Sequence, residues 1–121
     1  MPKTRRAEGF EMAEKQSDWD ISVEDLKQLL DEGTDFFLLD VREPHEVAVA
    51  SLGGTNIPLS KVAANLDDIP KDKKVVVHCK SGGRSAKATT ALRQLGFDDA
   101  WNVQGGTIAW TARIDPSLPT Y

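Results

Sequence analysis

Cysteine, histidine and surplus positive charge are all scarce in this chain of 121 residues. Its single cysteine cannot form an internal disulfide or a cysteine-rich zinc site, and the two histidines, His45 and His78, add little toward a metal site. Lys and Arg together number 15 against 19 Asp and Glu, and the resulting net charge of −4 does not favour binding to nucleic acid. We therefore expect no metal, no cofactor and no nucleic-acid partner.

The sequence also lacks any apolar run that approaches the roughly 20 residues needed to span a bilayer. Its first residues, MPKTRRAEGFEMAEKQ, contain an Arg-Arg pair with no hydrophobic stretch behind it, so they do not look like an export signal. We expect no membrane association and a cytoplasmic location. The length suits one domain, and we expect a flexible extension over residues 1–18 followed by a folded domain over residues 19–121.

Short apolar runs alternate with segments of helical spacing along the folded part. The expected strands are FFLLDV (36–41), TNIPL (55–59), KKVVVHC (73–79) and DAWNV (99–103). The expected helical segments are 22–33, 43–51, 60–69, 84–97 and 107–114. This alternation predicts an α/β fold, with a mainly parallel β-sheet and helices on both of its faces.

The only cysteine follows a run of valines, at the point where such a sheet would place a binding site. Cys79 ends the strand VVVHC, and ligands of open parallel sheets bind beyond the carboxyl ends of the strands. The residues that follow, KSGGRS (80–85), are small or cationic and lead into a helix. Backbone N–H groups in such a turn favour an anion, so we expect the pKa of Cys79 to lie below the roughly 8.5 of a free thiol. The alternative is a buried cysteine that only fills space, which would not explain so polar a turn.

Four segments of the chain resemble those of single-domain rhodaneses, which are sulfurtransferases related to the Cdc-type phosphatases. The segments are LLDVREPHE, GGTNIPL, VVVHCKSGGRSAKA and NVQGGTIAW, and the resemblance covers residues 19–121. It implies a rhodanese-like fold with Cys79 as the catalytic residue. Cys79 would carry sulfane sulfur as a persulfide, taken from thiosulfate or another persulfide donor and passed to a thiophilic acceptor, such as cyanide in vitro. One departure is visible: members commonly have a His-Ile pair where this chain reads Ala50-Ser51-Leu52.

The same resemblance implies that the loop after the cysteine binds the substrate. The expected substrate-binding residues of this loop are Lys80, Ser81, Gly82, Gly83, Arg84 and Ser85. Their backbone N–H groups would hold the terminal sulfur, and Lys80 and Arg84 would attract an anionic donor. Arg84 could instead tie the loop down through backbone carbonyls.

Three further residues have expected positions or roles. Arg42 would bind the oxyanion of the donor, or else pair with Glu46 or hold a loop. Asp40 is expected to support the loops by accepting hydrogen bonds. His78 precedes Cys79 in a strand, so its side chain should point to the opposite face, and we do not expect it to act as a base for the cysteine.

The number of residues between Cys79 and Arg84 distinguishes two enzyme classes. Related phosphatases use Cys-x5-Arg, a loop that wraps a phosphate, whereas this chain has four intervening residues. By analogy with the family, the shorter loop fits a persulfide sulfur, so sulfur transfer is favoured over Cys-dependent phosphate hydrolysis. A non-catalytic regulatory or binding module with the same fold is the other alternative, although such domains commonly lose the cysteine.

The C-terminal run NVQGGTIAWTARIDPSLPTY resembles the end of rhodanese domains fused to E1-like adenylyltransferases of the molybdopterin and thiamine sulfur pathways. That likeness implies a ubiquitin-like sulfur-carrier protein or a cysteine desulfurase as a partner. A general sulfurtransferase that takes a small anionic donor is the other interpretation. The chain contains no GxGxxG nucleotide-binding motif, so it corresponds to such a domain alone or to a stand-alone relative.

Overall fold

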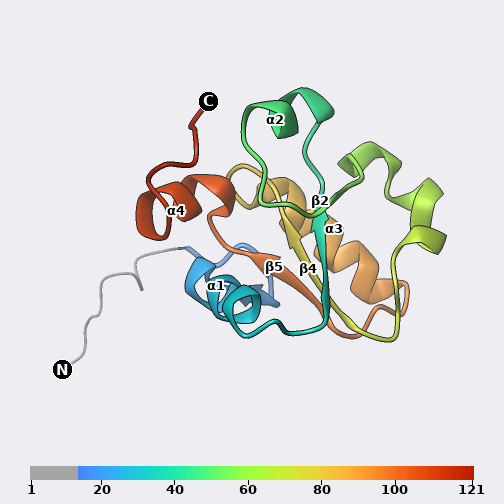
Figure 1. Ribbon diagram of the computed structural model, residues 1–121. Coiled ribbons are helices and arrows are strands. Elements are labelled where there is room, and N and C mark those ends of the chain that lie inside the picture. The colour runs from blue at the N-terminus through green and yellow to red at the C-terminus, as the bar shows by residue number, and fades with distance from the viewer. Residues whose placement is uncertain (1–13) are drawn as a thin grey trace.

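A parallel β-sheet of five strands organises residues 14–121, the part of the chain that the computed structural model describes (Figure 1). Its strands are β1 (Asp20–Ile21), β2 (Phe36–Asp40), β3 (Thr55–Asn56), β4 (Lys74–His78) and β5 (Ala100–Val103), in the spatial order β1-β5-β4-β2-β3. Every pairing between them is parallel. The predicted α/β fold with a mainly parallel sheet is therefore confirmed. The two-residue strand β1 was not expected from the sequence.

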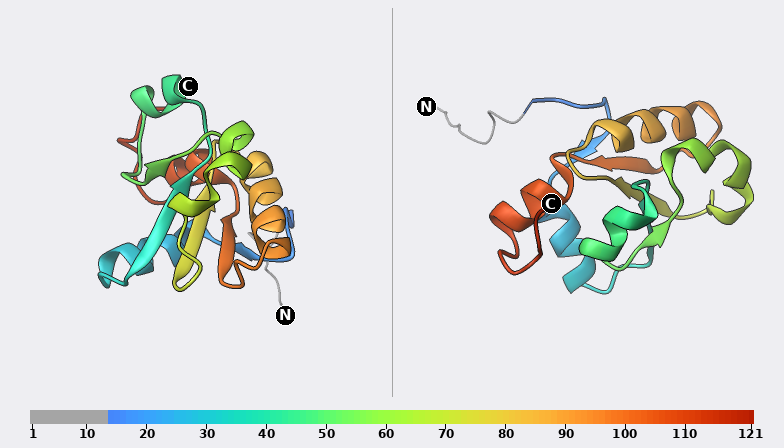
Figure 2. Two further views of the ribbon diagram at one scale, coloured as in Figure 1. Left: turned by 90° about the vertical axis from the view of Figure 1, so that its right-hand side faces the viewer. Right: turned by 90° about the horizontal axis from the view of Figure 1, so that it is seen from above.

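Helices cover both faces of this sheet, as predicted (Figure 2). They are α1 (Val23–Asp31), α2 (Pro44–Val49), α3 (Gly83–Gln94) and α4 (Gly106–Arg113). α3 packs on one face and α1 and α4 pack on the other, while α2 lies beyond the carboxyl ends of the strands. The site that the carboxyl ends of β2 and β4 define is thus enclosed by the starts of α3 and α4 and by α2.

The segment 60–69, expected to be helical, forms two short 3-10 helices, η2 (Leu59–Lys61) and η3 (Ala63–Asp68), in place of an α-helix. Asn65 leaves the helical region, with φ −126° and ψ 28°. Its side-chain amide donates to the carbonyl oxygen of Lys61 at 2.8 Å. A side chain that bonds to the nearby backbone competes with α-helix formation, which is the reason for the difference.

The central strand β4 shows why the valine run is continuous. Val75 and Val77 pack with α3 on one face, and Val76 packs with α1 and α4 on the other. Successive side chains of a strand point to opposite faces, so a strand buried on both sides needs apolar residues at every position. This packing fixes the place where the strand ends, and Cys79 is the next residue.

Helix α1 begins where the sequence predicts. The hydroxyl of Ser22 accepts a hydrogen bond from the backbone N–H of Asp25, and the carboxylate of Asp25 accepts one from the N–H of Ser22, each at 3.0 Å. This reciprocal capping satisfies two N–H groups that the first turn would leave without partners.

Residues 1–13 of the expected N-terminal extension lie outside the described residues. The remainder of that extension contacts the folded domain. Gln16 Nε2 donates to the carbonyl oxygen of Ser81 at 2.8 Å, and Gln16 Oε1 accepts from the N–H of Gly105 at 3.0 Å. Contacts with the folded domain therefore begin before residue 19, the expected boundary. Within residues 14–121 no helix combines the length and the apolar character needed to cross a bilayer.

Candidate active site around Cys79

The sulfur atom of Cys79 lies among hydrogen-bond donors at the carboxyl end of β4. Its Sγ accepts from the N–H of Gly82 at 3.1 Å, and from both the N–H and the hydroxyl of Ser85 at 3.4 Å. The residue is only 1% exposed. Gly82 has a φ of 101°, a conformation that side chains disfavour, so this glycine lets the chain turn back toward the sulfur. We call residues 79–85 the cysteine loop.

These donors favour the anionic form of the thiol. Burial alone would raise the pKa of Cys79, but hydrogen bonds from the side chain and N–H of Ser85 and from the N–H groups of Gly82 and Ser81 outweigh it and lower the pKa below that of an ordinary thiol. The direction agrees with the expectation from the sequence. A thiolate is the nucleophilic form of cysteine, so the loop prepares Cys79 to act as a nucleophile.

The carbonyl oxygens of the cysteine loop are held from outside by other parts of the chain. The N–H of Thr107 donates to the carbonyl of Cys79, and the N–H of Ile108 donates to that of Lys80, both at 3.0 Å. A Cβ atom at Gly106 would collide with these same two carbonyl groups. With its carbonyls turned toward α4 and Gln16, the loop directs its N–H groups toward the sulfur. The GG pair in NVQGGTIAW was the sequence signal for this contact, and sequence reasoning did not use it.

Arg84 has a different partner from the backbone carbonyls that we considered. Its two terminal nitrogens donate to the two carboxylate oxygens of Glu46 in α2, at 2.6 and 2.9 Å. This hydrogen-bonded pair lowers the pKa of Glu46 to about 2 and raises that of Arg84. Arg84 therefore ties the start of α3 to α2. Glu46 was expected as a partner only of Arg42, so its pairing with Arg84 is a correction to the sequence-based interpretation.

Arg42 is wholly buried, and each of the three nitrogens of its guanidinium donates to a protein group. It donates to both carboxylate oxygens of Asp40, to the carbonyl oxygen of Ala50 at 2.8 Å and to the hydroxyl of Tyr121 at 2.8 Å. These contacts are the ones expected of the loop-holding alternative, and a role for Arg42 in binding donor oxyanion stays a prediction. Asp40 accepts these hydrogen bonds and a further one from the N–H of Arg42, which is the arrangement expected of a loop-supporting residue.

His78 and Lys80 lie on either side of Cys79 in the sequence but make other contacts. The His78 ring is fully buried beside Asp40, with Nε2 3.6 Å from a carboxylate oxygen, and burial lowers its pKa. His78 is not among the donors to the sulfur. Lys80 is itself a residue of the cysteine loop, and its ammonium lies 4.5 Å from the centre of the Tyr121 ring. Of the six predicted loop residues, Gly82 and Ser85 donate to the sulfur, and the N–H of Ser81 also lowers its pKa. Gly83 opens α3, while the side chains of Arg84 and Lys80 contact Glu46 and Tyr121.

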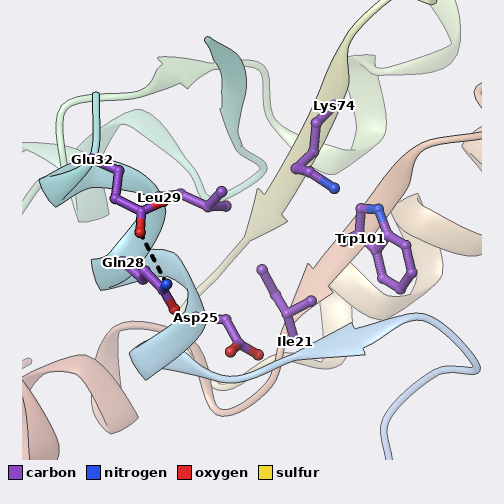
Figure 3. A pocket seen from close by; sticks show the side chains of 7 residues that line it. All are labelled: Ile21, Asp25, Gln28, Leu29, Glu32, Lys74 and Trp101. Carbon is purple, nitrogen blue, oxygen red and sulfur yellow. Dashed lines mark hydrogen bonds between the residues drawn. The ribbon is translucent and has the colours of Figure 1, made fainter. Parts of the chain in front are cut away.

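A hollow of about 300 Å³ lies away from the cysteine, between α1 and the sheet (Figure 3). Its lining residues are Ile21, Asp25, Gln28, Leu29, Glu32, Lys74 and Trp101. The carboxylate of Asp25 caps α1, that of Glu32 accepts from Gln28 at 3.0 Å, and Lys74 pairs with Asp99. These polar groups are already paired with one another or with neighbours, so the hollow offers no candidate nucleophile.

Comparison with known proteins establishes the family. The model of the rhodanese-like domain matches residues 22–113. A protein named "Sulfurtransferase" from Allochromatium vinosum is 37% identical over 92 residues, which cover 75% of this chain and 86% of that protein. The chain therefore belongs to the rhodanese-like sulfurtransferase family.

Two further likenesses bear on the fold and on the surroundings of such domains. The crystal structure of a rhodanese-like domain protein from Staphylococcus aureus superposes with a TM-score of 0.73 at 32% identity, covering 85% of this chain and 98% of that one. "Probable adenylyltransferase/sulfurtransferase MoeZ" from Mycobacterium tuberculosis is 36% identical over 104 residues. The match covers 84% of this chain but only 26% of MoeZ.

Proposed function

We propose that this protein transfers sulfane sulfur, which it carries as a persulfide on Cys79, from an anionic donor such as thiosulfate to a thiophilic acceptor. The observation that carries the proposal is the set of donors aimed at the sulfur: the N–H groups of Gly82 and Ser85 and the Ser85 hydroxyl. Donors aimed at an atom that carries negative charge stabilise that charge.

The transfer proceeds in two displacements at sulfur. In the first, the Cys79 thiolate attacks the outer sulfur of thiosulfate, a sulfur–sulfur bond forms, and sulfite leaves with the electron pair of the bond that breaks. In the second, cyanide or another thiophile attacks the terminal sulfur of the persulfide, and the Cys79 thiolate leaves. No proton has to be moved in either step with these substrates, so the mechanism needs no base beside the Cys79 thiolate. Covalent catalysis divides one transfer into two easier ones.

Two features favour sulfur over phosphate as the transferred group. Arg84 is engaged by both carboxylate oxygens of Glu46, so its guanidinium is not free to clamp a phosphoryl group in the loop. The loop is also one residue shorter than the Cys-x5-Arg loop of the related phosphatases. A non-catalytic binding module would not need the donors around the thiol, and their presence favours an enzyme.

The physiological acceptor that we favour is the C-terminus of a ubiquitin-like sulfur-carrier protein. The likeness to MoeZ, whose name joins adenylyltransferase and sulfurtransferase, supports this proposal. A cysteine desulfurase is the corresponding candidate for the donor in the cell. We keep a cytoplasmic location as a prediction.

A cyanide-coupled assay that measures thiocyanate formed from thiosulfate tests the proposed activity. The wild-type protein should turn over, and Cys79→Ser should not, because serine cannot form a persulfide. The variant should unfold at the same temperature as the wild type, which serves as the control for an intact fold. Residual activity above about one tenth of the wild type would refute Cys79 as the carrier, since covalent catalysis requires it.

A further inference from the structure

A line of hydrogen-bonded polar groups leads from Cys79 along the α3 face of the sheet to β1. The hydroxyl of Ser85 lies 3.4 Å from Cys79 Sγ and 2.6 Å from the side-chain oxygen of Asn102. The side-chain amide nitrogen of Asn102 donates in turn to the carboxylate of Asp20 at 2.8 Å. Ser85 and Asn102 are both 0% exposed, so solvent does not compete for the hydrogen bonds of the Ser85 hydroxyl.

The Ser85 hydroxyl has one proton and two acceptors. It can donate to Asn102 or to Cys79 Sγ, but not fully to both at once. Asp20 fixes the orientation of the Asn102 side-chain amide. Because the Asp20 carboxylate accepts from the amide nitrogen, the amide oxygen must face Ser85. Burial would raise the pKa of Asp20, but hydrogen bonds from Asn102 and from residues 16 and 17 lower it, so the carboxylate stays ionised and can only accept.

We propose that Asn102 is a positioning residue of the sulfur site, which accepts the Ser85 hydrogen bond while Cys79 Sγ is uncharged and loses it to Sγ when the thiolate forms. In the thiol, Sγ–H can itself point at the Ser85 oxygen while the hydroxyl donates to Asn102. In the thiolate, the hydroxyl turns to the sulfur and leaves the buried oxygen of Asn102 without its partner. A buried acceptor without a partner is costly, so Asn102 opposes the thiolate.

The persulfide part of this inference rests on the proposed function. In a persulfide the negative charge moves to the terminal sulfur and Sγ becomes an uncharged bridging atom. The Ser85 hydroxyl can then return to Asn102, and this regained hydrogen bond favours the sulfur-loaded form over the free thiolate. Asn102 thus favours the persulfide form of Cys79 until an acceptor removes the sulfur.

Other charges also act on the thiol and must be kept constant in a test. The charged or titratable groups on the surrounding elements are Arg84 of α3, Glu46 of α2, Asp40 of β2 with Arg42, His78 of β4, Lys80, Asp20 of β1 and Tyr121. Of these only Asp20 contacts Asn102 directly. Residue 102 could therefore change the pKa of Cys79 either through the Ser85 hydroxyl or through Asp20. Removing the Ser85 hydroxyl separates these two effects.

The test is a double-mutant cycle on the thiol pKa of the reduced protein, followed by the ultraviolet absorbance of the thiolate. The four proteins are the wild type, Asn102→Leu, Ser85→Ala and the double variant, with Asn102→Ala as the replacement if the leucine variant does not fold. Asn102→Leu should lower the pKa of Cys79 by about one unit, because formation of the thiolate then no longer leaves a buried oxygen without a hydrogen bond. The same change in the Ser85→Ala background should leave the pKa unchanged. An equal shift in both backgrounds, no shift, or a rise in the pKa would overturn the proposal.

A second measurement uses the unmodified sequence and so does not depend on the folding of any variant. The side-chain carbonyl carbon of Asn102, observed by NMR, should change its chemical shift with the same midpoint as the ionisation of Cys79. A flat trace through that pH range would overturn the proposal. Both measurements use reduced protein without a sulfur donor, so their outcome is independent of whether the protein transfers sulfur.

Discussion

The ion pair between Glu46 and Arg84 gives a pH-dependent prediction for stability. The pKa of Glu46 falls from 4.5 to about 2 in the folded protein. Because the folded pKa lies below the unfolded one, the stabilisation is fully present above about pH 5 and is lost as the pH falls toward 2. The full difference corresponds to about 3 kcal/mol in the free energy of unfolding. The Arg84 side chain is 35% exposed, so solvent screening reduces the expected contribution to about 1–2 kcal/mol.

Glu46→Gln should therefore lower the free energy of unfolding by about 1–2 kcal/mol at pH 7 and by much less near pH 2, where the wild-type carboxylate is becoming protonated. Urea denaturation of both proteins across this pH range measures the difference, and other carboxylates cancel in the comparison. The matched control is the same substitution in an Arg84→Ala background, where it should cost little. If Glu46→Gln lowered the free energy of unfolding equally at both pH values, or equally with and without Arg84, the ion pair would not be the source of the stabilisation.

Three further predictions concern the cysteine loop. Alkylation of Cys79 by iodoacetamide should follow an apparent pKa below about 8.5, and a normal or higher value in the absence of donor would return the residue to a space-filling role. Gly106→Ala should destabilise the protein by more than about 1 kcal/mol beyond Gly33→Ala in thermal unfolding: both glycines have positive φ, but only at Gly106 would a Cβ collide with backbone. Equal losses would contradict the close packing of α4 on the loop. One glycine inserted between Gly82 and Gly83 should weaken sulfur transfer; if the unmodified protein were instead the better catalyst on para-nitrophenyl phosphate and inert to thiosulfate, loop length would be the wrong discriminator.

Local sequence patterns predicted the parts of the fold that depend on neighbouring residues. The apolar runs of β2 and β4 and the capping of α1 by Ser22 were predictable because burial on both faces and helix capping leave their mark within a few positions. β1 has only two residues and pairs with a strand about 80 positions away. Such a short segment has no periodicity, so its pairing depends on the tertiary structure.

The candidate site divides in the same way. Cys79 and its loop were predictable because the small residues and the cations are adjacent in sequence. The partner of Arg84 was not, since Glu46 lies 38 positions away and the two meet only because α2 packs beside the start of α3. Asn102 looked like an ordinary residue of a buried strand, and only the register of β5 beside β4 places it next to Ser85. Contacts of this kind follow from topology and are not visible in a local pattern.

The central claim is that Cys79 carries sulfur, and intact-protein mass spectrometry tests it most directly. Reduced protein incubated with thiosulfate and freed of excess donor should gain the mass of one sulfur atom, located on Cys79 by fragmentation. Addition of cyanide should return the original mass and release thiocyanate in equal amount, while Cys79→Ser should gain no mass. If the wild-type protein forms thiocyanate without ever gaining that sulfur, or gains it at another residue, the persulfide mechanism is wrong.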